Sequence, residues 1–166
     1  MKELPLTQGK VALVDDEDYE WLNKWKWYAA NIGGLWYAYR GAQTPKGQRA
    51  LGMHRVIYSK YCTLDKRKMI DHIDSNGLNN RKLNLRMCTS SQNQMNRNGI
   101  KNSSSKYKGV GWHSKVNSWA ARIKHKGKMY NLGHFKNENE AAETYNKAAK
   151  KYFGEFARLN KTRSMG

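Results

Sequence analysis

The chain of 166 residues lacks any long hydrophobic run, and it contains only two cysteines and two prolines. No segment approaches the roughly 20 consecutive apolar residues that a membrane-spanning helix needs. The first ten residues, MKELPLTQGK, lack the apolar region of a signal peptide, so we expect an intracellular protein with no membrane association. Cys62 and Cys88 form no CxxC pair, which gives no support to a zinc knuckle or a disulfide framework. We expect both cysteines to be small buried apolar residues.

Acidic residues are also scarce. Lys and Arg number 31 against 13 Asp and Glu, which gives a formal net charge of +18. From Ser75 through Asn137 the chain has no Asp or Glu but thirteen Lys and Arg residues. Such a stretch repels itself unless an anion neutralises it; nucleic acid is the usual anion, and an anionic membrane surface is the rival. Six Trp and ten Tyr residues argue against disorder, and the length fits one ordinary domain or two small ones.

Residues 1–50 predict an N-terminal α/β extension. The apolar run KVALV (10–14) is typical of a strand, and DDEDYEWLNKWKWYAA (15–30) predicts a helix with carboxylates at its positive end. LWYAYRG (35–41) predicts another strand and TPKGQ (44–48) a turn. The Trp-rich helix could complete the core of the next segment or touch DNA. We favour the core, because the acidic start of the helix would repel phosphate.

Residues 51–98 predict the order strand, loop, strand, helix. MHRVIYSKYC (53–62) is a candidate short helix, KMID (68–71) a strand, SNGLNNRKLN (75–84) an irregular loop and LRMC (85–88) a second strand. In TSSQNQMNRN (89–98), Thr89 and Gln92 make a capping box that predicts the start of a helix.

Residues 99–105 have the composition of a linker, and residues 106–160 predict a second domain. YKGVGWHSK, SWAARIKHKGK and MYNLGHF indicate three strands with turns at KVNS and HKGK. Asn137 with Glu140 predicts the start of a helix that Gly154 ends. We expect one apolar face of this helix to cover one side of the sheet, leaving the other side to Trp and basic residues. That helical face comprises Ala141, Ala142, Tyr145, Ala148, Ala149 and Tyr152.

The segment MIDHIDSNGLNNRKLNLR (69–86) contains candidate residues for phosphodiester hydrolysis. That reaction needs an activated water, stabilisation of an anionic transition state and help for the leaving oxygen. A neutral His accepts the water's proton near pH 7, and one divalent ion with Asp or Asn oxygen ligands can supply the rest. Asp71 and His72 are neighbours on a strand, so their side chains point to opposite faces. This geometry argues against a direct contact between the two.

IDHIDSNGLNNRKLNLRMCTSSQNQMNR resembles the motif of the HNH endonucleases, in the form seen in phage and intron homing endonucleases. The resemblance implies an α+β fold with a ββα-metal (His-Me finger) core. It implies that His72 is the general base and that Asp71 is the first metal ligand. Asn84 matches the middle Asn, which pins the loop and helps to orient the His. Asn93 stands where the last His of the motif would be and would be the second ligand, which favours Mg²⁺ or Mn²⁺ over Zn²⁺.

Each of these residues also has a simpler interpretation. Asp71 and Asp74 could be turn residues, and His72 could be an ordinary histidine at a strand end. The asparagines could only shape the loop or lie exposed on a helix. The joint spacing favours the site, except at Asp74, where shaping the loop is an equal alternative. His54, Arg55 and Arg81 are candidate DNA contacts, although His54 could serve phosphate contact or packing.

Residues from about 105 to 160 resemble a second family, the plant Apetala-two/ERF DNA-binding domain, through YKGV, WAARI, LGHF, EAAETYNKAA and GEFARLN. The resemblance implies a small three-stranded antiparallel sheet with one packed helix, which lays its sheet in the major groove. Lys replaces Arg in YKG, and Lys does not make the bidentate guanine contact that Arg makes, so the target sequence of the plant family does not carry over. Trp119 could equally be a core residue. The candidate DNA contacts are Lys108, Trp112, His113, Lys115, Arg122 and Lys124.

Together these features predict a metal-dependent DNA endonuclease of the homing type, in a phage-like mobile element acting in the host cytoplasm. Its partner would be double-stranded DNA, with no small-molecule cofactor, and its products would carry 5′-phosphate and 3′-hydroxyl ends. A monomer would nick, whereas a DNA-bound dimer could cut both strands. The alternatives are a non-catalytic, sequence-specific DNA-binding regulator and an RNA-binding protein or ribonuclease.

Overall fold

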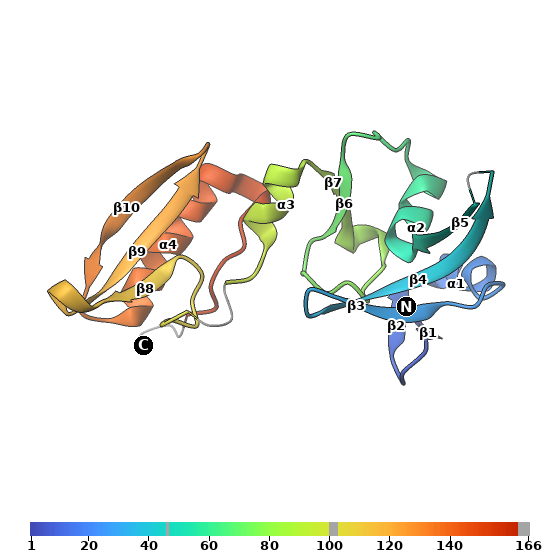
Figure 1. Ribbon diagram of the computed structural model, residues 1–166, viewed down its shortest axis with the longest axis horizontal. Helices are drawn as coiled ribbons and strands as arrows, with labels where there is room; N and C mark the ends of the chain where they lie inside the picture. Colours follow the sequence, from blue (N-terminus) through green and yellow to red (C-terminus); the bar gives the residue numbers. More distant parts are fainter. Residues whose placement is uncertain (46, 100–102, 163–166) are drawn as a thin grey trace. The chain divides into compact units, whose positions relative to one another are not determined.

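The computed structural model describes residues 1–45, 47–99 and 103–162, which form two compact units, Met1–Ser90 and Ser91–Gly166 (Figure 1). Within the described residues the chain has four α-helices and four small antiparallel sheets, so the α+β prediction is confirmed at this level. No helix in the described ranges is long and apolar enough to cross a membrane.

The first unit begins with a β-hairpin, β1 (Lys2–Pro5) and β2 (Val11–Val14), followed by α1 (Asp16–Leu22). A three-stranded antiparallel sheet follows in the order β3 (Tyr28–Ile32), β4 (Leu35–Thr44) and β5 (Gly47–Gly52). The predicted strands and the acidic first turn of α1 are confirmed. The predicted turn at 44–48 joins β4 and β5, although Lys46 lies outside the described residues.

The helix predicted over residues 15–30 is wrong in its length. It ends at Leu22, and the Trp27 indole N–H donates a hydrogen bond of 2.9 Å to the carbonyl oxygen of Leu22. That bond satisfies a carbonyl group at the helix end and turns the chain toward β3. Trp27 is buried in the core. Tertiary packing therefore ends the helix early, in a segment that has helical spacing but is rich in aromatic residues.

The middle segment follows the predicted order. It contains α2 (Met53–Tyr61), β6 (Met69–His72), the short 3₁₀ helix η1 (Lys82–Asn84), β7 (Leu85–Cys88) and α3 (Ser90–Asn96). β6 and β7 pair antiparallel, with Asp71 opposite Arg86 and His72 opposite Leu85. Thr89 lies directly before α3, where the predicted capping box placed it. Cys88 is buried as expected, but Cys62 is exposed just beyond the end of α2, so that prediction is wrong for Cys62.

One hydrophobic core joins the N-terminal fifty residues to the middle segment. Its members come from β1, β2, α1, β4, α2 and β7, and they include Leu22 and Trp27 beside Met53 and Ile57. The interpretation of residues 1–50 as part of the core is therefore confirmed. The full set of buried members is Leu4, Ala12, Val14, Leu22, Trp27, Ala38, Met53, Ile57 and Leu85.

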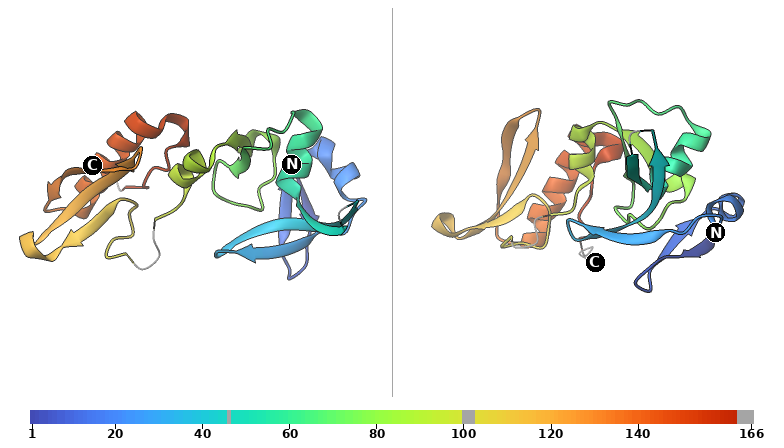
Figure 2. Two further views of the ribbon diagram at one scale, coloured as in Figure 1. Left: turned by 45° about the horizontal axis from the view of Figure 1, so that its top comes forward. Right: turned by 45° about the vertical axis from the view of Figure 1, so that its right-hand side comes forward.

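The second unit contains the predicted three-stranded meander, β8 (Val110–His113), β9 (Ser118–His125) and β10 (Lys128–Phe135), in the order β10-β9-β8. The 3₁₀ helix η2 (Ser114–Val116) lies between β8 and β9, and η3 (Gly154–Phe156) ends α4. α4 (Glu138–Phe153) lies along one face of the sheet in both Figure 1 and Figure 2. The Asn137 side chain accepts a hydrogen bond of 2.8 Å from the Asn139 N–H, which confirms the predicted helix start.

The prediction that Trp residues lie on the open face of this sheet is wrong. Val110 pairs with Ala121, and both pack against α4 in the core. Trp112 pairs with Trp119, and each lies two residues from the Val110–Ala121 pair on its own strand. Side chains two residues apart on a strand share a face. Both Trp side chains therefore lie on the helix-bearing face, where Trp119 packs against the core and Trp112 stays 43% exposed at the edge.

The described end of the predicted linker is bonded to the second unit. The Ser104 hydroxyl accepts a hydrogen bond of 2.8 Å from the Trp112 N–H, and the Ser105 hydroxyl donates one of 2.7 Å to Glu138. Residues 100–102 of that segment lie outside the described residues. Ser103–Ser105 are thus part of the fold that carries the meander.

Candidate active site

Asn84 braces the loop between β6 and β7. Its side-chain oxygen accepts a hydrogen bond of 3.0 Å from the Asp74 N–H. Its amide nitrogen donates to Asp74 Oδ1 at 2.9 Å and to the carbonyl oxygen of Asn79 at 2.7 Å. The side chain is 8% exposed, so these bonds form where water competes little. The geometry agrees with the brace that the motif implies for Asn84.

Asp74 organises the same loop from its other side. Its carboxylate accepts hydrogen bonds from the Asn76 N–H at 2.8 Å and from the Asn79 side chain at 2.7 Å, in addition to the bond from Asn84. Burial alone would raise the pKa of Asp74, but these donors outweigh it and hold the pKa below its ordinary value. Asp74 therefore shapes the loop, which is one of its two alternative interpretations.

The N-terminal extension holds this loop through its backbone. Leu13 of β2 donates to the carbonyl oxygen of Leu78 and accepts from the Asn80 N–H, both at 2.8 Å. Asp15 accepts a hydrogen bond of 2.8 Å from the Lys82 N–H at the start of η1. A Cβ atom at Gly77 would lie 2.4 Å from the Trp36 carbonyl oxygen, so only glycine permits this approach to β4.

His72 lies buried, 4% exposed, at the end of β6. Its Nε2 is 3.3 Å from Oδ1 of Asn80, which is itself fully buried. Because a carboxamide oxygen only accepts, this contact favours the tautomer with hydrogen on Nε2 and leaves Nδ1 as the acceptor. Burial lowers the pKa of His72, although the bond to Asn80 and the charges of Asp74 and Asp71 oppose the shift. The ring is therefore neutral near pH 7, as a general base must be. The sequence analysis predicted Asn80 only as a residue of the loop, without a contact to His72.

His54 packs against His72. The two ring centroids are 5.2 Å apart, and Tyr37 and Tyr39 lie beside the His54 ring at 6.3 and 6.4 Å. Burial, together with the nearby His72 and Arg55, lowers the pKa of His54 to about 3. A neutral ring in this position supports His72, so the geometry favours packing over phosphate contact. Arg55 is exposed on α2.

Asp71 faces a different set of groups from His72, as expected for neighbours on a strand. Its Oδ2 lies 3.1 Å from Nη2 and 3.2 Å from Nε of Arg86, its partner across the β6–β7 pair. The carboxylate is 8% exposed. Arg81, the other predicted contact in this region, donates from Nε to Asn79 Oδ1 at 2.9 Å.

Asp71 offers one carboxylate to a hard divalent ion, although its Oδ2 already pairs with Arg86 at 3.1 Å. Such an ion accepts carboxylate and carboxamide oxygens, needs only one or two carboxylates, and completes its shell with water and phosphate oxygens. In the described part of the chain no group of three or more His, Cys, Asp or Glu residues could hold a metal, so the N/S-rich donor set of a zinc site is missing there. Asn93, the predicted second ligand, is half-buried on α3, and its role stays a prediction from the motif.

In the second unit, Arg122 and Lys124 are exposed on β9 and alternate with Ile123, which is buried under α4. They therefore lie on the open face of the sheet. His113 lies on the same face, with its ring centroid 5.3 Å from that of His134, and Lys115 is exposed in η2. Lys108 differs from these residues because its ammonium group donates to the carbonyl oxygens of Met95 and Arg97 at 2.5 and 2.7 Å.

Comparison with known proteins shows which family the chain belongs to. The family model of the HNH endonucleases matches residues 51–95. A protein of Acanthamoeba polyphaga mimivirus, named as an uncharacterised HNH endonuclease, is 33% identical over 156 residues, which cover 93% of this chain and 76% of that protein. Protein 3.8 of Escherichia phage T7 is 35% identical over 63 residues, covering 38% of this chain and 52% of that protein.

The chain belongs to the HNH endonuclease family. The family implies a nuclease with DNA as its substrate, and its members typically depend on a divalent metal ion. The matched residues contain Asp71, His72, Asn84 and Asn93, all four residues that the motif singles out.

Proposed function

We propose that this protein is a metal-dependent DNA endonuclease of the homing type, with His72 as the general base and Mg²⁺ (or Mn²⁺) held by Asp71 and Asn93. The observation that carries the proposal is His72: a buried histidine with a lowered pKa, fixed by Asn80 on a loop that Asn84 braces. The likeness to viral and phage proteins supports a mobile element acting in a host cell, where the host cytoplasm is the expected location.

The residues supply the steps of a hydrolysis. His72 Nδ1 accepts the proton of the attacking water, while the Nε2–H bond to Asn80 keeps the ring in the required tautomer and orientation. Asn84 fixes the loop and thereby the position of the ring. Asp71 and Asn93 would hold the divalent ion, which would supply stabilisation of negative charge on the scissile phosphate and the departing 3′ oxygen. The expected products are 5′-phosphate and 3′-hydroxyl ends.

We further propose that the second unit is an Apetala-two/ERF-type reader of duplex DNA. Support comes from the three-stranded meander backed by one helix, and from the open face that bears Arg122 and Lys124, with Lys115 exposed in η2. Log affinity should fall by about 0.9 for each phosphate neutralised per tenfold rise in salt. A salt-insensitive affinity would contradict this assignment.

The test is incubation of supercoiled plasmid with Mg²⁺, with and without chelator, followed by separation of supercoiled, nicked and linear forms. We expect metal-dependent cleavage that His72→Ala abolishes, while affinity for DNA in chelator stays nearly unchanged. His125→Gln changes a histidine of the second unit and should leave cleavage intact. Cleavage that survives His72→Ala contradicts the catalytic assignment. DNA binding without cleavage by the unaltered protein favours the alternative, a non-catalytic DNA-binding regulator. A nicked product indicates a monomeric nickase, and a linear product indicates a dimer that cuts both strands.

A further inference from the structure

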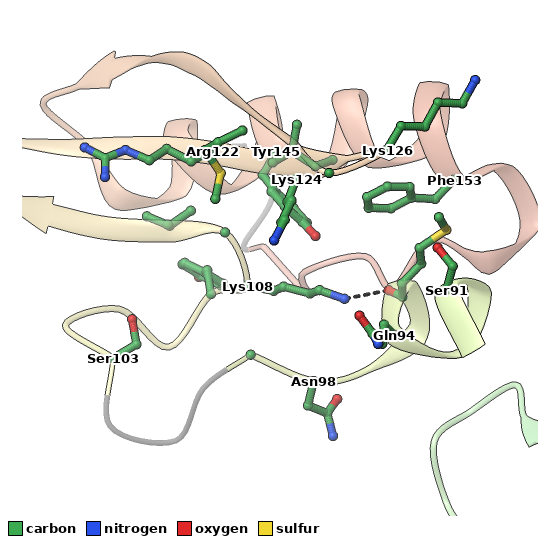
Figure 3. Close-up of a pocket in the computed structure, with 18 residues that line it drawn as sticks. Ser91, Gln94, Asn98, Ser103, Lys108, Arg122, Lys124, Lys126, Tyr145 and Phe153 are labelled. Carbon is green, nitrogen blue, oxygen red and sulfur yellow. Dashed lines mark hydrogen bonds between the residues drawn. The ribbon is translucent and has the colours of Figure 1, made fainter. Parts of the chain in front are cut away.

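A cavity of about 520 Å³ lies within the second unit, bounded by α3, the start of β8 and the turn between β9 and β10 (Figure 3). Four cationic residues line it: Lys108, Arg122, Lys124 and Lys126. Among the described residues that line it, none is Asp or Glu. No carboxylate of the same wall compensates these charges, so an anion that enters the cavity would meet a net positive field.

Tyr145 gives the cavity a hydrogen-bond donor. The residue is 3% exposed and lines the cavity. Burial raises the pKa of Tyr145 to about 12, so the hydroxyl keeps its proton. A phenol hydroxyl at the wall of the cavity can donate a hydrogen bond to a ligand or a water in it. Gly109 permits this placement of the ring, because a Cβ there would lie 2.1 Å from Tyr145.

Lys108 is fixed with its charge at the wall of the cavity. Its ammonium group donates to the carbonyl oxygens of Met95 and Arg97 at the end of α3, and Figure 3 shows it directed toward that helix. Burial, then the charges of Arg158 and Arg97, lowers the pKa of Lys108 to about 8. A bound anion would offset the electrostatic repulsion between Lys108 and the neighbouring cations.

The rest of the wall is apolar. Met95, Met129 and Phe153 line the cavity together with the buried Ile123. Thioether and aromatic groups are suitable partners for a flat aromatic ring. The cavity thus presents cations and a hydroxyl donor beside an apolar surface, and its volume falls within the range of about 300–1,000 Å³ typical of small-molecule sites.

We propose that this cavity binds a single nucleotide unit, with its phosphate against the lysines and the Tyr145 hydroxyl and its base against Met95 and Phe153. Cationic groups that hold the backbone beside apolar and aromatic groups that hold the base are the features of single-strand binding. A base inside a protein cavity cannot stay paired, so the unit would come from an unpaired position of a strand or from a free nucleotide. Where it comes from a strand, the inference rests on the DNA binding proposed above.

The test is binding to the full chain in chelator, so that no cleavage occurs. Probes are deoxyadenosine 5′-monophosphate, deoxyadenosine, inorganic phosphate and a short oligodeoxyadenylate. We expect the monophosphate to bind more tightly than the nucleoside or phosphate alone. Tyr145→Phe removes only the hydroxyl and should weaken binding by about five- to tenfold, the value of one hydrogen bond. Tyr130→Phe removes a hydroxyl that does not line the cavity and is its control.

Lys126→Gln and Lys128→Gln are a matched pair in the β9–β10 turn. Both are exposed and carry the same charge, but only Lys126 lines the cavity. We expect Lys126→Gln to weaken nucleotide binding clearly more than Lys128→Gln does. If the two variants lose affinity equally, the attraction is general electrostatics and the inference is overturned. A monophosphate that binds no more tightly than phosphate also overturns it, because the apolar wall then contributes nothing.

The same experiment distinguishes a free nucleotide from a nucleotide unit of a strand. Sensitivity to Lys126→Gln and Tyr145→Phe with both probes supports a site that accepts a free nucleotide, whereas sensitivity with the oligonucleotide alone supports a unit of a strand. Insensitivity with both overturns the inference. Plasmid cleavage measured in parallel keeps the two proposals distinct: cleavage without specific nucleotide binding refutes only the cavity, and nucleotide binding without cleavage refutes only the nuclease.

Discussion

Replacing Asn84 by Ala should destabilise the loop between β6 and β7. The substitution removes three hydrogen bonds of 2.7–3.0 Å that join Asn84 to Asp74 and to the Asn79 carbonyl group. Each neutral bond is worth about 1 kcal/mol and the one to a carboxylate about 2 kcal/mol, so the first unit should lose roughly 3–4 kcal/mol of unfolding free energy. Asn79 is buried, so its carbonyl group loses a bond that water does not readily replace, whereas the exposed Asp74 can bind water instead.

The measurement is urea unfolding of the variant, followed through the tryptophans of the first unit. Asn76→Ala is the matched control in the same loop, because Asn76 is exposed and its side chain makes a single bond of 3.1 Å to the Leu78 N–H. We expect that control to cost about 1 kcal/mol or less. Cleavage by Asn84→Ala should fall by a factor on the order of 100 at temperatures where it stays folded, because His72 loses its fixed position. Equal destabilisation by the two variants would refute the bracing role.

Three further predictions concern pH and packing. Because His54 has a pKa of about 3 when folded and an ordinary value when unfolded, the first unit should lose about 1.4 kcal/mol of stability per pH unit below pH 6.5, and His54→Gln should reduce that slope in acid unfolding curves. Gly77→Ala should destabilise the first unit in thermal melts because its Cβ would overlap the backbone of β4, whereas Gly41→Ala, with its nearest contact at 3.7 Å, should be nearly neutral; equal melting temperatures would contradict the contact. Lys108 has a pKa of about 8 when folded, below its unfolded value, so the second unit should gain stability between pH 8 and 10.5, and Lys108→Met should lose this gain whereas Lys106→Met, at an exposed position, should keep it.

The local pattern of the chain was sufficient for much of the fold. β6, β7 and α3 follow in the predicted order because each is a short segment with its own alternation or capping signal. The meander and α4 were predictable for the same reason, since Asn137 and Gly154 mark the ends of the helix through bonds and angles that depend on neighbouring residues only.

Long-range packing explains the predictions that were wrong. α1 ends early because Trp27 enters a core formed with α2 and β7, residues far away in the sequence. Trp112 lies on the helix-bearing face because its register with Trp119 aligns it with Val110 and Ala121, and strand composition does not reveal register. Cys62 is exposed because α2 ends immediately before it.

The sequence by itself determined the family and the candidate residues Asp71, His72, Asn84 and Asn93, because their spacing is a local property of one short segment. Only the tertiary structure decided how that segment is held. The backbone bonds from Leu13 to the loop, the His54 ring against His72 and the cavity beside Tyr145 each join residues distant in the chain. Such contacts depend on which surfaces the hydrophobic core brings together, and no local pattern specifies that.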